Sequence, residues 1–169
     1  MPTAIIVGNP KPASRTLDAA QLLATKLTGR PADQVFDLVE YGAALLDWND
    51  AGIKAAVEEV AKSNLVIVAS PTFKATYTGL LKLFLDRFAG QTGMQGVVAI
   101  PLMLGAGERH ALAVEVHLKP VLAEIGAACP TPGLYLNDKT YAEGPDMDRF
   151  VETWKPVIDL LLAAQGDRA

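Results

Sequence analysis

The sequence predicts an α/β protein built as a doubly wound, five-stranded parallel sheet with helices on both faces. Short apolar runs rich in Val and Ile alternate with longer segments of helical periodicity, which is the pattern of successive β–α units. The runs lack the polar alternation of a half-exposed strand, so we expect them to be buried on both faces. With 169 residues, half of them apolar, the chain is expected to form one domain over residues 1–169 with strand order 2-1-3-4-5.

The first β–α unit has clear local boundaries. Residues 4–7 (Ala-Ile-Ile-Val) form the first strand, and Gly8 ends it. Ser14 is placed to cap a helix over residues 15–28, which Gly29 terminates.

The second unit is less sharply marked. Residues 35–39 predict a strand, although Asp37 places a polar side chain inside it. Asp50 can cap a helix that runs to about Ser63.

The third strand leads into the segment around which the chain is organised. Residues 65–68 are apolar and β-branched, and Pro71 ends the strand because it has no N–H to donate to the sheet. The chain then crosses the carboxyl edge of the sheet before a helix over residues 78–88. In open α/β sheets that edge is where ligands bind.

The fourth unit contains two prolines that disturb regular structure. Residues 96–104 predict a strand, and Pro101 indicates its end or a bulge. A helix is predicted over residues 111–125, where Pro120 should produce a kink or a widened turn.

The last unit is a short strand over residues 134–136 and a helix over residues 146–164. Pro156 lies inside this helix and is expected to kink it.

Composition excludes several functional classes. A formal charge of −4 and a pI of about 5.1 argue against a nucleic-acid-binding role. No apolar run approaches the roughly 18 residues of a membrane span, and the N-terminus does not resemble a secretory signal. Cys129 is the only cysteine, which suits a reducing compartment, so we expect a cytoplasmic protein. The two histidines and one cysteine lack the spacing of a metal site.

Three loops at the carboxyl ends of strands one, three and four should converge at one site. The loop over residues 8–16 offers Lys11, Arg15 and two hydroxyls at a helix N-terminus, which suits a phosphate. Its alternative reading is an ordinary capped helix with solvated cations. The sequence lacks the Gly-x4-Gly-Lys-[Ser/Thr] signature of ATP hydrolysis.

The other two loops could contact a planar ring. Phe73 and Tyr77 provide aromatic surface, although both could equally be core residues of a strand-to-helix turn. Gly105 and Gly107 would let the backbone approach a ring closely, or would simply form a tight turn. As a dinucleotide fingerprint this pair is weak, because the third glycine is missing.

Three sequence stretches carry a family resemblance. Residues 71–86 read Pro-x-Phe-Lys-Ala-x-Tyr-x-Gly-x-Leu-Lys-x-x-Leu-Asp, and the likeness extends to residues 8–16 and 105–122. In this order they resemble the NADPH-dependent FMN reductases of flavodoxin-like fold, and among these the alkanesulfonate-utilisation flavin reductases.

The resemblance implies that NADPH or NADH reduces FMN by hydride transfer, with no catalytic acid or base supplied by the protein. It also implies that reduced FMN leaves to supply a partner monooxygenase. The implied phosphate contacts are Lys11, Ser14, Arg15 and Thr16, and Asn9 in the same loop is also an implied cofactor-binding residue. The implied ring and ribityl contacts are Pro71, Thr72, Phe73 and Lys74, with Leu104, Gly105 and Gly107 on the pyrimidine side. Tyr77 is placed near the site or at a subunit contact.

Two positions depart from the family pattern. The family usually has Ser and Arg where this chain has Asn9 and Lys11. Lysine keeps the charge but loses the planar two-pronged donor, so we expect the site to persist with weaker flavin binding.

The choice among related activities stays open at this stage. A quinone, azo-dye or chromate reductase would keep FMN bound and use another acceptor, and a flavodoxin-type electron carrier would not turn over pyridine nucleotide. No arginine can be assigned to the 2′-phosphate that distinguishes NADPH from NADH. Whether FMN is a substrate or a bound group is equally open.

Two helices predict self-association. Few polar residues interrupt the segments 78–88 and 111–125, so neither shows the broad polar face of a surface helix. We therefore expect a homodimer or homotetramer in which another subunit covers them.

Overall fold

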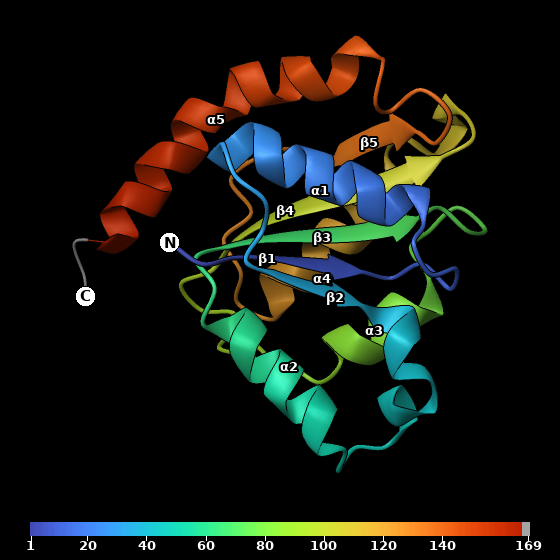
Figure 1. Cartoon of the computed structure of the whole chain (residues 1–169), viewed down its shortest axis with the longest axis vertical. Coiled ribbons are helices and arrows are strands. Elements are labelled where there is room, and N and C mark those ends of the chain that lie inside the picture. Colours follow the sequence, from blue (N-terminus) through green and yellow to red (C-terminus); the bar gives the residue numbers. More distant parts are fainter. Residues whose placement is uncertain (167–169) are drawn as a thin grey trace.

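The protein, described here by a computed structural model over residues 1–166, contains one five-stranded parallel sheet of order β2-β1-β3-β4-β5 (Figure 1). The strands are β1 (Thr3–Val7), β2 (Gln34–Asp37), β3 (Leu65–Pro71), β4 (Val98–Gly105) and β5 (Leu134–Asn137). The α-helices are α1 (Arg15–Thr28), α2 (Ala51–Ala61), α3 (Gly79–Leu85), α4 (Lys119–Glu124) and α5 (Pro145–Gly166). The predicted strand order and the flavodoxin-like architecture are confirmed. Within residues 1–166, no helix has the length and apolar character needed to cross a membrane.

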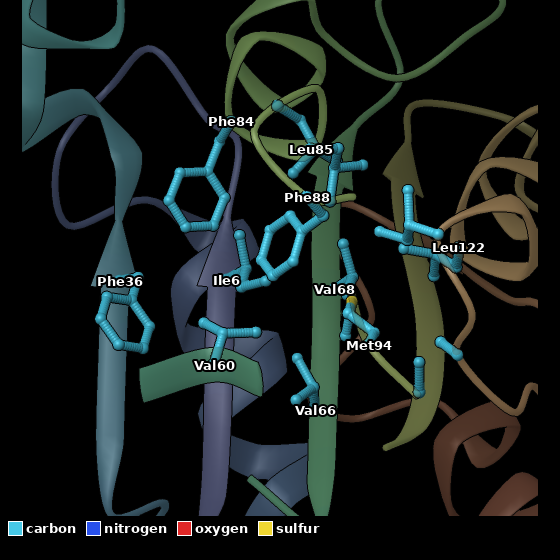
Figure 2. Close-up of a cluster of buried hydrophobic side chains, with 14 of the residues drawn as sticks. Ile6, Phe36, Val60, Val66, Val68, Phe84, Leu85, Phe88, Met94 and Leu122 are labelled. Atoms are coloured by element: carbon cyan, nitrogen blue, oxygen red, sulfur yellow. The ribbon is translucent and has the colours of Figure 1, made fainter. Parts of the chain in front are cut away.

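Helices cover both faces of the sheet. Alternate strand residues point to opposite sides, and apolar residues on both sides have to be covered. On one face, α1 and α5 cover a cluster that includes Ile5 and Ile67. On the other face, α2, α3 and α4 cover a cluster that includes Ile6 and Val68 (Figure 2). In this second cluster the rings of Phe84 and Phe88 meet edge to face, with centroids 5.6 Å apart.

The predicted helix starts are confirmed by their caps. The Ser14 hydroxyl accepts a hydrogen bond from the Leu17 amide at 3.2 Å, and the Asp50 carboxylate accepts one from Ile53 at 2.9 Å. Gly29 ends α1 in the left-handed conformation, with φ of 75°.

Two predicted boundaries need correction. The second strand ends at Asp37, and the segment Leu38–Leu46 continues as 3-10 helix rather than as strand. This segment bends at Gly42, whose φ of 52° and ψ of −127° interrupt any regular helix. The third helix ends at Leu85 rather than at residue 88.

The prediction for Pro101 was wrong, because this proline lies inside β4 and pairs in register with Val68. The amide of Val98 donates toward the β3 side and that of Ala99 toward the β5 side, so the N–H missing from Pro101 would also face β5. Pairing with β5 begins only at Leu102. The proline therefore costs the sheet no hydrogen bond with β5.

The widened turn before Pro120 is confirmed. Residues Val114–Leu118 form a π-helix, in which the Lys119 amide donates to the Val114 carbonyl. The predicted single helix over 111–125 is thereby divided into this segment and α4. Pro156 lies within α5, which continues on both sides of it.

Candidate functional site

A cleft of about 450 Å³ lies at the carboxyl edge of the sheet, where the loops after β1, β3 and β4 meet. The predicted site residues that line it are Asn9, Lys11, Ser14, Arg15, Thr16, Pro71, Thr72, Phe73, Leu104 and Gly105. Pro10, Ala13, Ala106 and Asp138 complete the lining. The structure therefore brings three loops together that are far apart in the sequence.

Three of the predicted site residues do not line the cleft. Lys74 lies at the tip of a turn, and Tyr77 is half-buried against the cluster beneath α3. Gly107 is exposed, and its carbonyl accepts a hydrogen bond from the Tyr135 hydroxyl at 2.7 Å.

Asn9 holds the loop at the start of α1 in place. Its Nδ2 donates to the buried Thr16 hydroxyl at 2.9 Å, and its Oδ1 accepts from the Lys11 amide at 2.9 Å. Ala13 takes a left-handed conformation, with φ of 49°, just before the cap residue Ser14. Asparagine at position 9 therefore has a structural role within the loop.

The start of α1 suits an anion. The first amides of an α-helix lack acceptors within the helix, and their dipoles favour negative charge. Ser14 satisfies the amide of Leu17, and both Lys11 and Arg15 are exposed beside this end of the helix. Two cations beside the first amides of a helix are an arrangement that suits a phosphate.

Arg15 already has a partner among the residues that line the cleft. Its Nη1 donates to the Asp138 carbonyl at 3.0 Å, and its Nη2 lies 3.1 Å from Oδ2 of the Asp138 carboxylate. The segment after β5 is also attached to α1 through the Tyr141 hydroxyl, which donates to Asp18 at 2.7 Å. That hydrogen bond to a carboxylate raises the pKa of Tyr141 to about 12.

The loop after β3 forms the apolar wall of the cleft. The Thr72 amide donates to the Leu104 carbonyl at 2.6 Å, which joins this loop to the end of β4. The Thr72 hydroxyl oxygen is buried and has no hydrogen-bond partner among the described residues. The Phe73 side chain is half-exposed. A buried, unpaired hydroxyl beside an exposed aromatic ring suits a ligand that is planar and carries polar edges.

Phe73 also begins a two-residue turn. Its amide donates to the Thr76 carbonyl at 2.9 Å, and the Thr76 amide donates back at 3.2 Å. Lys74 and Ala75 between them have φ of 51° and 67°. Both central residues of such a turn require positive φ, which normally selects Asn and Gly, so this turn stores strain beside the cleft.

Thr78 connects two of the three loops. Its hydroxyl caps α3 by accepting from Leu81 at 3.2 Å and donates to the Gly8 carbonyl at 2.5 Å. Its amide donates to the buried Ser70 hydroxyl at 3.1 Å. Gly8 must be glycine here, because a Cβ would lie 2.4 Å from the Cβ of Leu81.

Asp37 lies at the same edge of the sheet, at the end of β2. Burial raises the pKa of its carboxyl, while the amides of Ala13 and Val39 act in the opposite direction. Cys129 does not line the cleft, and burial raises the pKa of its thiol to about 11, so the thiol is poorly nucleophilic.

Sequence reasoning missed two residues of the site. Asp138 lines the cleft and Tyr135 supports the Gly105 loop. Asp138 directly follows β5, and a polar residue after a parallel strand is a signal that could have placed it at this edge.

Comparisons with known proteins show the family to which the chain belongs. Residues 1–142 match the family described as NADPH-dependent FMN reductase. The FMN reductase (NADPH) of Escherichia coli (strain K12) is 27% identical, over 93% of this chain and 84% of that protein. The NADH-dependent FMN reductase SfnF of Pseudomonas fluorescens (strain Pf0-1) is 30% identical, over 77% of this chain and 73% of that protein.

A solved structure shares both fold and sequence. The apo form of an NADH:FMN oxidoreductase, EMOB, superimposes with a TM-score of 0.80 at 28% identity, over 96% of this chain and 88% of that one. The sequence match and the structural match thus point to the same class of flavin-using protein.

Proposed function

The chain belongs to the NADPH-dependent FMN reductase family, and we propose that it binds FMN in the cleft at the carboxyl edge of the sheet. It is an oxidoreductase that uses FMN and a reduced pyridine nucleotide, and hydride passes from nicotinamide to FMN. One observation carries the proposed site: the loops after β1, β3 and β4 line a single cleft with a cationic end and an apolar end.

The phosphate of FMN would lie at the start of α1. Lys11 and Arg15 supply positive charge there, and the cap residue Ser14 fixes the direction of the helix end. This assignment is supported by the unpaired amides of the first turn, which bind anions without cost to the helix.

The ring and ribityl chain would lie along the second and third loops. Phe73 and Leu104 give apolar surface, and the buried Thr72 hydroxyl lacks a partner that a polar edge of the ring could supply. The donor set therefore fits the flavin, and Gly105 borders the same wall. Lys74, Tyr77 and Gly107, which do not line the cleft, are not included in the proposed contacts.

When bound, FMN supplies the hydride acceptor, and the protein has to hold and orient the two rings. Thr72 and Leu104 fix the position of the wall through their backbone hydrogen bond at 2.6 Å. Asp138 is the one carboxylate among the residues that line the cleft, and no general base stands beside a nucleophile there. Proximity is then the main contribution of the chain to the rate.

A steady-state assay with purified protein, free FMN and each pyridine nucleotide tests this function. Oxidation of NADPH or NADH is expected only when flavin is added. Turnover without flavin, or no turnover with either nucleotide, would contradict the assignment. Retention of FMN through gel filtration, with rapid electron transfer to quinones, azo dyes or chromate, would favour the alternative reductases. Tightly bound flavin without oxidation of NADPH or NADH would indicate an electron carrier.

We also propose that reduced FMN leaves to supply a partner monooxygenase. Two features support flavin release: Lys11 cannot form a two-pronged contact with phosphate, and Arg15 is already paired. We propose a cytoplasmic location as well, because a chain with Cys129 as its single cysteine suits a reducing compartment.

We propose a homodimer or homotetramer built on α3 and the π-helical segment. The fold itself buries most apolar side chains of these segments, including Leu81 and Leu118. Leu83, Leu112 and Val116 remain exposed, and they support a subunit contact at this surface.

A further inference from the structure

We propose that the Asp138 carboxylate competes with the phosphate of FMN for the Arg15 guanidinium, and so keeps flavin binding weak. This inference rests on the proposed function and concerns one ion pair between two residues that line the cleft. It makes Asp138 a residue that decides how long flavin stays bound.

The first argument is the geometry of the pair. Both terminal nitrogens of Arg15 are directed to Asp138, one to its carbonyl at 3.0 Å and one to its carboxylate at 3.1 Å. Both residues line the cleft, and Arg15 is the first residue of α1. An anion that contacts Arg15 at this helix end must therefore share the guanidinium with Asp138 or displace it.

The second argument is the state of the carboxylate. Its Oδ1 is buried without a hydrogen-bond partner among residues 1–166, and the side chain as a whole is 25% exposed. Because the described residues offer Oδ1 no partner, this largely buried negative charge depends on the Arg15 guanidinium for neutralisation and retains it against a competing phosphate. Lys11 is the only other cation among the residues that line the cleft.

The third argument is that the pair is not needed to hold the chain together. Tyr141 bonds to Asp18, and the Asp138 amide donates to the Gly105 carbonyl at 2.9 Å, so two other contacts fix this segment. The Arg15 side chain is 60% exposed, a setting in which an ion pair adds little to stability. The pair is better explained by its position opposite the helix end.

The test is a binding titration by flavin fluorescence, without nucleotide and without turnover. Asp138→Asn preserves the size of the side chain and the backbone hydrogen bond to Gly105. We expect it to tighten FMN binding by a factor of about two to five, the range of an exposed ion pair. Riboflavin, which has no phosphate, should bind as it does to the parent protein. Asp138→Ala should likewise tighten FMN binding and leave riboflavin binding unchanged.

A matched control and a double variant isolate the mechanism. Asp159→Asn removes one acidic group and its exposed ion pair with Lys155. Both residues belong to α5 and neither lines the cleft, so the affinities for FMN and riboflavin should stay unchanged. In an Arg15→Ala background, Asp138→Asn should no longer tighten FMN binding, because the guanidinium for which the two anions compete is gone.

The outcomes separate this inference from the proposed function. If the parent protein binds no FMN, the proposed site itself is wrong. If FMN binds but Asp138→Asn leaves its affinity unchanged, the competition is refuted and the FMN site stands. Weaker binding of both flavins would show that Asp138 accepts from the ring or ribityl chain, which also overturns the proposal. A gain that persists without Arg15 would mean direct repulsion of phosphate and would overturn it too.

Discussion

Gly105 and Gly107 belong to one loop, yet only one of them has to be glycine. A Cβ on Gly105 would lie 1.9 Å from the Tyr135 hydroxyl oxygen and 2.8 Å from its Cζ. A Cβ on Gly107 would meet nothing within 4 Å, and its φ of −169° is ordinary extended backbone. The space that Gly105 leaves is thus filled by Tyr135, a residue of the same chain.

The two glycines should therefore respond oppositely to alanine. Gly105→Ala forces the ring of Tyr135 to move and should lower the free energy of unfolding by about 1 kcal/mol. It should also weaken the binding of FMN and of riboflavin equally, because it disturbs the wall against which the flavin ring is proposed to lie. Gly107→Ala should raise the free energy of unfolding by up to about 1 kcal/mol, because it restricts only the unfolded chain. Urea denaturation measures the free energy of unfolding of both variants. If Gly105→Ala is as stable as Gly107→Ala, the Tyr135 ring moves aside without cost.

Lys11 and Arg15 should matter for the phosphate alone. The double change Lys11→Ala/Arg15→Ala removes two charged contacts, each worth roughly 1.5–3 kcal/mol when fully formed. Solvent exposure and the competing Asp138 reduce this, so we expect FMN binding to weaken about tenfold, or ~1.4 kcal/mol. Riboflavin titrated in parallel should bind as before. An equal loss of affinity for FMN and riboflavin would mean that the variant damages the fold. An unchanged FMN affinity would place the phosphate elsewhere.

Which site residues the sequence could predict depends on how local their signals are. Lys11, Ser14 and Arg15 fall within one helix start, so a short pattern was enough to group them. Asp138 meets Arg15 across 123 positions. Its place after β5 could have put it at this edge of the sheet, but the sequence does not show that it contacts Arg15. Tyr135 was missed for the same reason, since its hydroxyl reaches Gly107 only when β4 and β5 pair.

At the scale of elements, the turn at Phe73–Thr76 is the clearest strained feature beside the site. Lys74 and Ala75 both have positive φ, and each such residue costs of order 1 kcal/mol. Lys74→Asn/Ala75→Gly should relieve this strain, with part of the gain offset by the entropy of glycine. We expect the melting temperature to rise by about 2–4 °C, which corresponds to about 1 kcal/mol.

A glycine placed elsewhere provides the control. Ala163→Gly in the exposed part of α5 should lower the melting temperature, because glycine is about 1 kcal/mol less favourable than alanine in a helix. A decrease in both variants would show that the turn is not strained.

Elements were predictable where a single residue defines their boundary. Ser14, Gly29 and Asp50 each mark a helix end through a bond made within a few residues, and all three predictions hold. Pro101 was misjudged, because the sequence does not show which side of a strand lacks a partner. The segment Leu38–Leu46 was also missed, since it lacks both a side-chain cap and a helical period across Gly42.

At the scale of the whole molecule, exposed apolar side chains on α3 and the π-helical segment support the proposed self-association. Leu83 on α3 is 38% exposed and Val116 in the π-helical segment is 55% exposed. Replacing either with aspartate should lower the assembly state, because a contact between subunits would bury an unpaired charge. Light scattering at matched concentration measures this. Leu160→Asp on α5, where the parent side chain is 71% exposed on the other face of the sheet, should leave the assembly unchanged. A monomeric parent protein would refute the proposal.

The Thr78 hydroxyl would have a thermodynamic consequence for the proposed assembly. It joins the loop after β1 to the first turn of α3, and α3 also carries Leu83 at the proposed subunit contact. Flavin binding and subunit association would then act on the same short helix from its two sides. Such coupling is reciprocal: the factor by which association changes the affinity for FMN is the factor by which FMN changes the association constant. Where association strengthens FMN binding, dissociation of the subunits on dilution would weaken that binding and release flavin.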